Sequence, residues 1–562
     1  MSPTLYHVAR AALATLLLTS CRTWLPEPAT PERYPASEAR SEPKANGVHS
    51  DRPQSSEVHP GWATGVVFAD RDGDGARGDG EPGIAGVAVS NGREVARSDA
   101  QGRYRLPVDD DAILFVVKPS GWRTPTTPEH LPRFHYIHKP AGSDPGLRFP
   151  GVAPTGPLPL SVDFPLMPQA EPDAFSVIVF GDTQPYDLEQ LDHLSRDVIS
   201  ELIGTDAAFG FTLGDLVGDD LSLFEPLARA LARIGVPWYN VIGNHDLNFD
   251  ARDDAGSDES FERVFGPSTY AFEYARAHFL VLDDVVYGGA DRDPPSTQNY
   301  RAGLGADQLA FVRAYLEGVP RDDLVVALMH MPLAGPPPFG FEQGRELLAL
   351  LSGRPNTLSF SSHTHMQYQR FLGPEDGFQG PGPHLHVNQG AVAGSWWLGA
   401  KDELGIPHAT MRCGAPNGWS ILSIDGARFR LRFQAARRPA SHQMSIFAPT
   451  AVPSAEAAAS EVLVDVFAGS DRSRVEMKLG DTDAWQTLER VERPDPFYLE
   501  LLAREAALGP KLGRPLPPAA PSLHLWRGTL PANPPPGTHT LEVRSTDVFG
   551  QRFTAHHLIR IE

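Results

Sequence analysis

Five short polar strings in the middle of the chain each follow or end an apolar run, and this arrangement constrains the fold more than any other feature. The apolar runs have the length and composition of buried strands: SVIVF, FGFTL, WYNVI, DLVVALM and TLSF. The polar strings beside them are GDTQ (181–184), GDLVGDD (214–220), GNHD (243–246), LMHMP (328–332) and SHTH (362–365). Open α/β folds bind ligands beyond the carboxyl ends of their strands, so the strings predict a ligand site on such a sheet.

The segments between these strands carry a helical pattern. Residues 187–203, 223–234 and 307–319 place apolar side chains at i, i+3, i+4 and i+7, while the strands between them are almost continuously apolar. This alternation predicts a layered α/β domain from about residue 175 to residue 433.

Short β-prone runs flank this central region on both sides. With 562 residues the chain is too long for one core, and three folded units are expected. Residues 61–168 predict a small antiparallel β-sandwich, and residues 437–562 a second β-domain interrupted by a Pro-rich insertion. The first resembles the SdrD B-like and carboxypeptidase-regulatory-like modules of bacterial surface proteins.

An acidic stretch, DRDGDGARGDGE, lies inside the first β-unit. Asp70, Asp72, Asp74 and Glu81 occupy positions 1, 3, 5 and 12 of a loop with Gly75 at position 6, which is the ligand spacing of a calcium loop. Strands rather than helices flank it, so a solvated acidic turn is the alternative.

The N-terminus has the features of a lipoprotein signal. Arg10 precedes the apolar run AALATLLL and the string Leu18-Thr19-Ser20-Cys21, which looks like a bacterial lipobox. We expect a signal peptide over 1–20, a lipid on Cys21 and a disordered tether over 21–60, with the protein anchored in the cell envelope. If the lipobox is not used, the protein would be secreted.

The overall charge excludes one class of partner. The formal net charge is −21, which would repel a polyphosphate backbone over most of the surface, so extended nucleic-acid binding is not expected. A local positive site made by metal ions stays open.

The five strings together supply the ligands of a two-metal site. Two divalent ions need hard oxygen ligands and several imidazoles from different loops, and they can then clamp a phosphoryl group. The chain here resembles the calcineurin-like metallophosphoesterases, whose motifs run D-x-H, G-D-x-x-D, G-N-H-[DE], H and G-H-x-H. The resemblance extends to HVNQGAVAGSWWLG (386–399), GIPHATMRCGAPNGW (405–419) and LHLWRGTLP (523–531), which look like the subfamily with its own N-terminal and C-terminal β-domains.

The resemblance implies a fold and a role for each ligand. The implied architecture is a four-layer α/β/β/α domain over residues 169–436 between two β-sandwich domains. In this arrangement Asp182 and His365 would bind the first metal, and Asp215 would bridge both. The implied ligands of the second metal are Asn244, His330 and His363.

His245 is the implied proton donor to the leaving oxygen, while a metal-bound hydroxide attacks phosphorus. An acidic neighbour would orient its imidazole, with Asp219 as the candidate and Asp220 as the other choice.

Two residues depart from the family pattern. Gln184 stands where a histidine is more usual, so it would give the first metal an amide oxygen, bond to a metal-held water, or not ligate at all. The harder ligand set favours manganese, magnesium or iron over zinc. Ser362 replaces a glycine, a change expected to be tolerated.

The function that follows is an exported phosphoester hydrolase, with diesters favoured over monoesters, acting on a small molecule, a lipid head group or an envelope polymer. The alternative is a surface scaffold with an inactive fold of the same kind. Four further residues are candidates for a rim that recognises a ring or a lipid-like group: Trp396, Trp397, Asn417 and Trp419.

Overall fold

Two sheets form the centre of the middle domain. In the computed structural model the described residues are 61–290, 299–334, 341–508 and 514–562. The first sheet has the order β11-β10-β9-β20-β21, and the second has the order β12-β13-β16-β17-β19-β18. The strands of the first sheet are β9 (Ala174–Phe180), β10 (Phe209–Leu213), β11 (Trp238–Val241), β20 (Gly418–Asp425) and β21 (Arg428–Ala435). Those of the second are β12 (Tyr270–Tyr274), β13 (Ala277–Val281), β16 (Leu324–Leu328), β17 (Thr357–Ser361), β18 (Tyr368–Leu372) and β19 (His384–Asn388).

Parallel pairing dominates the interior of both sheets. Strands β9, β10 and β11 run parallel, as do β13, β16, β17 and β19, whereas β12, β18, β20 and β21 pair antiparallel to their neighbours. The carboxyl ends of β9, β10 and β11 therefore meet at one edge of the first sheet.

The side chains of β9 show why the strand is almost continuously apolar. Val177 and Val179 join the core between the two sheets, while Ile178 and Phe180 pack with the helices on the other face. Because successive strand residues point to opposite faces, a strand covered on both sides needs apolar residues at every position. This is the α/β/β/α arrangement that the sequence predicts.

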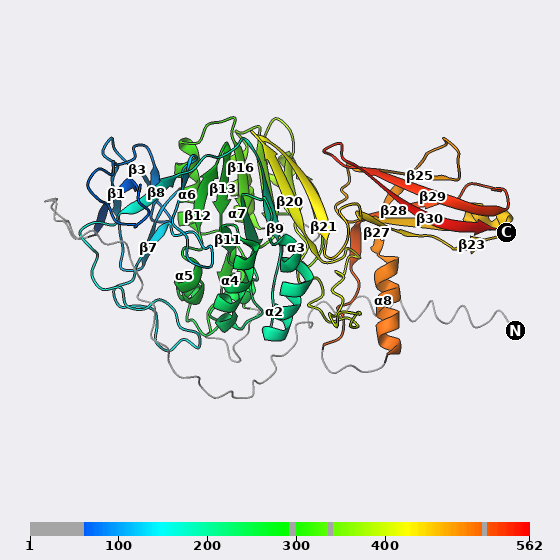
Figure 1. Ribbon diagram of the computed structural model, residues 1–562, viewed down its shortest axis with the longest axis horizontal. Coiled ribbons are helices and arrows are strands. Elements are labelled where there is room, and N and C mark those ends of the chain that lie inside the picture. The colour runs from blue at the N-terminus through cyan, green and yellow to red at the C-terminus, as the bar shows by residue number, and fades with distance from the viewer. Residues whose placement is uncertain (1–60, 291–298, 335–340, 509–513) are drawn as a thin grey trace. The chain divides into compact units, whose positions relative to one another are not determined.

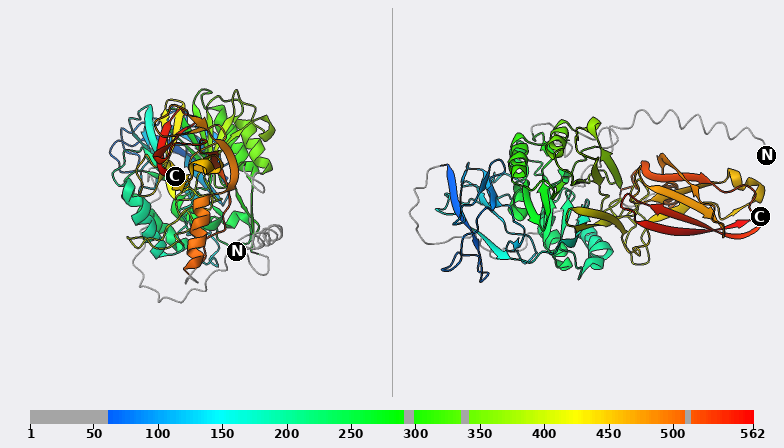
Figure 2. Two further views of the ribbon diagram at one scale, coloured as in Figure 1. Left: turned by 90° about the vertical axis from the view of Figure 1, so that its right-hand side faces the viewer. Right: turned by 90° about the horizontal axis from the view of Figure 1, so that it is seen from above.

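Helices cover the outer faces of the two sheets (Figures 1 and 2). The first sheet carries α2 (Leu188–Leu194), a π-helical turn (Ser195–Ile199), α3 (Ser200–Leu202) and α4 (Phe224–Leu231), and the second carries α6 (Ala306–Glu317) and α7 (Glu342–Leu351). A further helix, α5 (Glu259–Phe265), follows the third polar string. None of the helices within the described ranges has the length and apolar character needed to cross a membrane.

The N-terminal domain consists of two four-stranded sheets, ordered β4-β1-β8-β6 and β3-β2-β5-β7. Their strands are β1 (Trp62–Ala69), β2 (Ala88–Ser90), β3 (Val95–Arg97), β4 (Arg103–Pro107), β5 (Ala112–Val116), β6 (Trp122–Arg123), β7 (His135–His138) and β8 (Phe164–Pro168). The expectation of a purely antiparallel sandwich is wrong in one place, because β1 pairs parallel to β8. The first and last strands of the domain lie side by side there, which the order of turn signals does not reveal.

The C-terminal domain also has two sheets, ordered β22-β24-β28-β27 and β23-β30-β29-β25-β26. Their strands are β22 (Met444–Phe447), β23 (Ala451–Val452), β24 (Glu461–Val466), β25 (Arg474–Leu479), β26 (Gln486–Thr487), β27 (Glu489–Pro494), β28 (Pro521–Thr529), β29 (Gly537–Thr546) and β30 (Arg552–Ile561).

One helix of this domain was not predicted from its strand-rich sequence, namely α8 (Pro496–Ala507). Its start is well capped, because Asp495 accepts a hydrogen bond from the Tyr498 amide at 2.8 Å and proline occupies the first turn. Near its other end, Glu505 accepts a hydrogen bond from the Ala400 amide at 2.8 Å. The helix thus contacts a loop of the middle domain.

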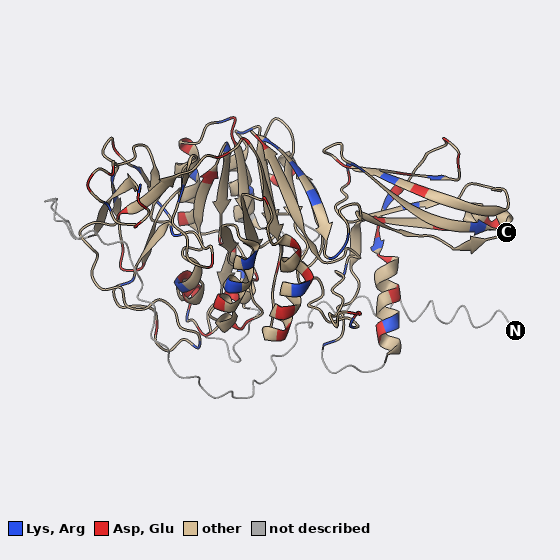
Figure 3. Cartoon of the chain, in the orientation of Figure 1, with Lys and Arg blue, Asp and Glu red and all other residues tan. Residues whose placement is uncertain are grey.

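Acidic and basic side chains are interspersed on all three domains (Figure 3).

The predicted signal peptide and tether, including Cys21, lie outside the described residues. The second cysteine, Cys413, is buried and forms no disulfide.

Candidate functional site

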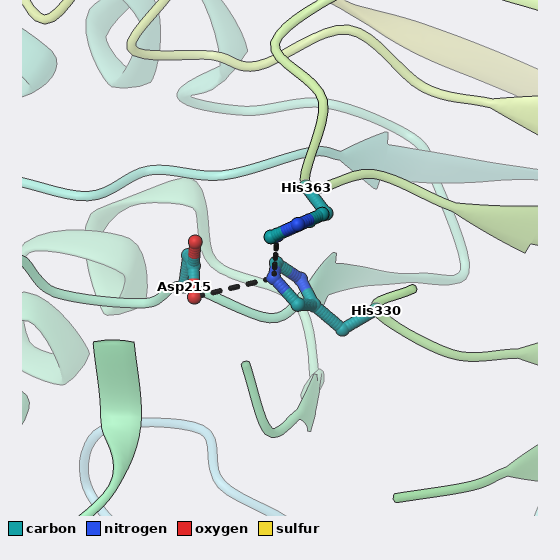
Figure 4. A group of neighbouring side chains, drawn as sticks. All are labelled: Asp215, His330 and His363. Atoms are coloured by element: carbon teal, nitrogen blue, oxygen red, sulfur yellow. Dashed lines mark hydrogen bonds and ion pairs between the residues drawn. The ribbon is translucent and has the colours of Figure 1, made fainter. Parts of the chain in front are cut away.

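The loops after β9, β10, β11, β16 and β17 bring the predicted ligands together. Asp215, His330 and His363 each offer one ligand atom, and these atoms all lie within 4.8 Å of one another (Figure 4). The three residues come from three different loops, as expected for strands whose carboxyl ends meet at one place.

His330 is the clearest sign that this group is built for a cation. Its Nδ1 lies 2.8 Å from the carbonyl oxygen of Leu213, so the neutral ring donates there and leaves a lone pair on Nε2. That Nε2 atom lies 3.0 Å from Oδ1 of Asn244 and 3.3 Å from Oδ1 of Asp215. A lone pair facing two oxygen acceptors is unfavourable unless a positive charge sits among them, so the donor set fits a divalent metal.

Without a metal, a proton on His330 supplies this positive charge, whereas His363 stays neutral. Without a metal, burial lowers the pKa of His330, but the carboxylate of Asp215 outweighs it and raises the pKa to about 10. Burial and the charge of His330 lower the pKa of His363 to about 3, which keeps its ring in the neutral form that binds metals. His363 Nδ1 lies 3.2 Å from His330 Nε2, so one cation can reach both rings.

A second group adjoins the first. His365 Nδ1 lies 2.7 Å from the carbonyl oxygen of Gly394, and its Nε2 lies 2.9 Å from Oδ2 of Asp182. Asp182 is fully buried, and its Oδ1 accepts a hydrogen bond from the His363 amide at 3.1 Å. Burial raises the pKa of Asp182, but the charge of His365 brings it below its usual value, so the carboxylate is ionised and available to a metal.

Asp215 lies close to both groups. Its Oδ1 faces His330 and also accepts a hydrogen bond from the His245 amide at 2.8 Å, whereas its Oδ2 lies 3.5 Å from Nε2 of Gln184. Burial raises the pKa of Asp215, but the charges of His330 and His245 lower it well below the usual range. A buried, ionised carboxylate close to both groups suits a bridge between two cations.

The glycines of two motifs allow this close packing. A side chain on Gly214 would place its Cβ 2.5 Å from Nδ1 of His330, and the φ angle of Gly214 is +85°. A side chain on Gly243 would place its Cβ 2.0 Å from the Asp215 amide nitrogen. Residues other than glycine cannot occupy these positions without moving the ligands.

Several ligand residues have a strained backbone. Positive φ angles of 48°, 63° and 51° occur at Asp215, His363 and His365, in a region that residues other than glycine rarely adopt. Such strain tends to gather at functional sites, where the surrounding structure holds it in place.

Ser362 replaces the glycine of the family pattern, a change expected to be tolerated. Its hydroxyl forms hydrogen bonds next to the metal ligands. Its hydroxyl donates to the carbonyl oxygen of Gln389 at 2.8 Å and accepts from the Asp182 amide at 3.3 Å. The serine therefore links the first and last motifs.

His245 lies beside the metal ligands and is held by Asp219. Nδ1 of His245 is 2.6 Å from Oδ1 of Asp219. Asp220, the other candidate, instead caps a short 3-10 turn by accepting from the Ser222 amide at 3.1 Å. Burial lowers the pKa of His245, but the carboxylates of Asp215 and Asp219 raise it well above its usual value, so the ring is a proton donor in the absence of metal.

Sequence reasoning missed four residues near the centre. Asp246 and Asp284 are fully buried and accept backbone hydrogen bonds from the loops that carry Asp215 and His330. The ring of Tyr186 lies 6.3 Å from that of His245, and the ring of Tyr300 lies 6.1 Å from that of His363. The D of GNHD signals Asp246, but no sequence pattern signals the other three.

The predicted aromatic rim is wrong for two of its four members. Trp397 and Trp419 are each 3% exposed and belong to the hydrophobic core under the helices. The buried Asp197 accepts hydrogen bonds from Trp397 Nε1 at 3.0 Å and from Asn417 Nδ2 at 2.7 Å, so Asn417 serves the framework as well. Among these four residues, Trp396 is the one that contacts a metal ligand, since its ring centroid lies 4.3 Å from that of His365.

His384 and His386, which lie close to these motifs in sequence, do not join the centre. Both are buried in β19, where the Ser359 hydroxyl lies 2.7 Å from His384 Nε2 and 2.8 Å from His386 Nδ1. Burial lowers the pKa of each to about 3, so both are neutral residues of the core.

The acidic loop of the N-terminal domain forms a second group of oxygen ligands. Carboxylate oxygens of Asp70, Asp72 and Asp74 lie within 4.8 Å of one another. Glu81 is not part of this group, because its two oxygens accept from the Arg71 amide at 2.7 Å and the Gly78 amide at 2.8 Å.

Three family models match successive parts of the chain. Residues 175–367 match the calcineurin-like phosphoesterases, residues 72–151 match the N-terminal domain of calcineurin-like phosphoesterases, and residues 386–553 match the C-terminal domain. The three matches follow in chain order and reach from the acidic loop to the last strand.

Two solved structures are similar in parts. The purple acid phosphatase PPD1 from yellow lupin (Lupinus luteus) seeds is 13% identical over 62% of this chain and 67% of its own, with a TM-score of 0.34. A metallophosphoesterase from Sphaerobacter thermophilus is 19% identical over 47% of this chain and 89% of its own, with a TM-score of 0.22. A search of curated proteins finds no match.

Proposed function

Since the chain belongs to the calcineurin-like phosphoesterases and is a hydrolase that acts on phosphoric esters, we propose that it is an exported phosphodiesterase that uses two divalent metal ions. The observation that carries the proposal is the position of Asp215 close to two adjoining groups of ligands. Asn244, His330 and His363 form one group around its carboxylate, and Asp182 with His365 forms the other, which the His363 amide joins to the first.

The metal ions and the side chains have separate roles in the proposed reaction. Two divalent cations supply an activated water molecule and neutralise the charge that develops on the phosphoryl group. Asp215 would keep both cations in place, and His245, oriented by Asp219, would give a proton to the leaving oxygen. The ligand set is rich in oxygen, which favours manganese, magnesium or iron over zinc.

A preference for diesters follows from the small number of positive side chains at the centre. In the described part of the chain, no lysine or arginine forms a hydrogen bond or ion pair with Asp182, Asp215 or His245. A monoester dianion needs more compensating charge than a diester monoanion, so the site suits the diester better.

The experiment is to load the purified protein with manganese and compare bis(p-nitrophenyl) phosphate with p-nitrophenyl phosphate. We expect metal-dependent hydrolysis of both, with the larger kcat/KM for the diester. A larger value for the monoester would contradict the diester preference, and hydrolysis of neither ester would favour the inactive scaffold.

A calcium ion in the acidic loop remains a prediction. Asp70 accepts hydrogen bonds from the Gly73 amide at 2.7 Å and the Gly75 amide at 3.1 Å, which turns the loop around its three carboxylates. Calcium should protect residues 70–81 from limited proteolysis, and a chelator should remove the protection. Identical digestion with and without the chelator would show that the loop is a solvated turn.

Attachment to the cell envelope also stays a proposal, and its support is the lipobox-like string that ends in Cys21. A lipidated protein should sediment with membranes when expressed in bacteria, and replacing Cys21 with serine should release it. If the wild-type protein is found in the soluble fraction, the lipobox is not used. Substrates near an envelope include lipid head groups, nucleotides and phosphate-linked polymers.

A further inference from the structure

Gln184 occupies a place beside the metal centre where its side chain has little freedom. It is 1% exposed, and its backbone amide donates to the carbonyl oxygen of Asp215 at 3.0 Å. Its φ angle of 35° lies in the left-handed region. The loop after β9 is therefore tied to the loop that carries the bridging carboxylate, and the amide group of Gln184 faces a fixed set of neighbours.

Trp396 decides which way this amide points. Nε1 of Trp396 lies 2.5 Å from Oε1 of Gln184. An indole nitrogen can only donate, so the atom that faces it must be the amide oxygen. The reverse orientation would place two donors against each other and leave both buried groups without an acceptor. One lone pair of the oxygen is thus taken by Trp396, and it is the NH₂ group that faces Oδ2 of Asp215, at 3.5 Å.

The position of Trp396 is itself fixed by the first-metal group. Its amide donates to the carbonyl oxygen of Ala393 at 2.7 Å, and the Ala393 amide donates to the carbonyl oxygen of Asp182 at 2.9 Å. Gly394, whose carbonyl oxygen holds the His365 ring, would place a Cβ 1.6 Å from the carbonyl oxygen of Ala409. One tight turn, 393–396, therefore positions Asp182, His365 and Gln184 together.

We propose that Gln184 is not a metal ligand and that it presents its NH₂ group, held by Trp396, to the metal centre as a hydrogen-bond donor. An amide NH₂ has no free lone pair for a cation. The first metal then has Asp182, His365 and the shared Asp215 as protein ligands, whereas the second has Asn244, His330 and His363 in addition to Asp215. The two positions differ in strength, so the second metal position fills first and the first holds its ion weakly.

The inference rests on the proposed two-metal centre, and its test measures metal binding without activity. The full chain is stripped of metal and titrated with Mn²⁺, and calorimetry and electron paramagnetic resonance give the number of bound ions and their dissociation constants. We expect one tightly bound ion and another whose dissociation constant is larger by about tenfold or more. Changes in the residues around a metal site typically alter its affinity by such a factor.

Three variants separate a donor from a ligand by the direction of the change. Q184A should leave the weaker constant unchanged or tighten it, because the N–H group competes with the cation for Asp215. Q184E places an oxygen where the NH₂ was and keeps the bond from Trp396, so it should tighten the weaker constant about tenfold or more. H365A removes a ligand from the first metal position. It should therefore weaken the binding of the ion at that position or abolish it.

The outcomes distinguish this inference from the proposed function. If Q184A weakens the binding of the ion at the first metal position as H365A does, Gln184 is a ligand and the inference is overturned. Two equally tight ions in the wild-type protein would overturn it as well. If the wild-type protein binds no divalent ion, the two-metal proposal fails and the inference falls with it. Thermal unfolding of Q184E, which has almost the same shape as the wild-type residue, shows that a changed constant does not come from a misfolded site.

Discussion

Replacing Asp215 with asparagine should remove both bound metals at once and lower kcat for a diester by about 10³ or more, because the metals supply several kcal/mol of transition-state stabilisation. The carboxylate contacts His330 of one group and lies close enough to Asp182 of the other to affect its pKa. Asparagine keeps the shape but removes the negative charge, which leaves Asn244, His330 and His363 as three neutral ligands. Metal content by mass spectrometry and steady-state kinetics measure the two effects.

Asp220→Asn is the matched control for this change. Asp220 is a neighbouring carboxylate that caps a 3-10 turn, a role that asparagine fills equally well. The control should therefore keep both metals and full activity. An Asp215→Asn protein that binds two metals and keeps its rate would refute the assignment of Asp215 as the bridge.

His245→Asn should lower kcat by about 10²–10⁴ for an ester with a poor leaving group, the usual scale for loss of a general acid. Its imidazole pairs with Asp219 rather than with the metal ligands, so metal content should not change. The loss should be much smaller for bis(p-nitrophenyl) phosphate, because p-nitrophenolate leaves without a proton. Comparison of that substrate with a dialkyl phosphate therefore separates proton donation from a structural role.

Asp219→Asn serves as the partner experiment. Asparagine can still form a hydrogen bond with the ring but lacks the charge that raises the pKa of His245. We therefore expect kcat to fall more for the dialkyl phosphate than for bis(p-nitrophenyl) phosphate, but by a smaller factor than in His245→Asn. If His245→Asn lowers kcat equally for both substrates and also loses metal, the role of His245 is to position the neighbouring ligand Asn244.

The sequence predicts the centre well because each ligand follows a strand. Parallel strands bring their carboxyl ends together within each sheet, so GD and GNHD meet on the first sheet and the two histidine motifs meet on the second. The packing of the two sheets then brings both sets together. The layered fold could be predicted for the same reason, since a strand such as SVIVF with no polar position must be covered on both faces.

The supporting residues could not be predicted in the same way. Tyr300 and Asp284 reach the centre through tertiary packing and have no motif of their own. The aromatic rim failed because tryptophans near a site in sequence more often bury their area in the core, as Trp397 and Trp419 do. Sequence left the role of Gln184 open because the direction of an amide depends on its partner, and that partner, Trp396, is distant in the chain.

The bond between Glu505 and the Ala400 amide makes the C-terminal domain hard to exchange as a module. Ala400 lies four residues beyond Trp396 on the same loop, and the Gly399 amide fastens that loop by donating to the carbonyl oxygen of His408 at 3.1 Å. Recombination that swapped the last domain would thus disturb the first-metal position while leaving every metal ligand in place. Domain shuffling in such a chain is constrained by catalysis as well as by folding.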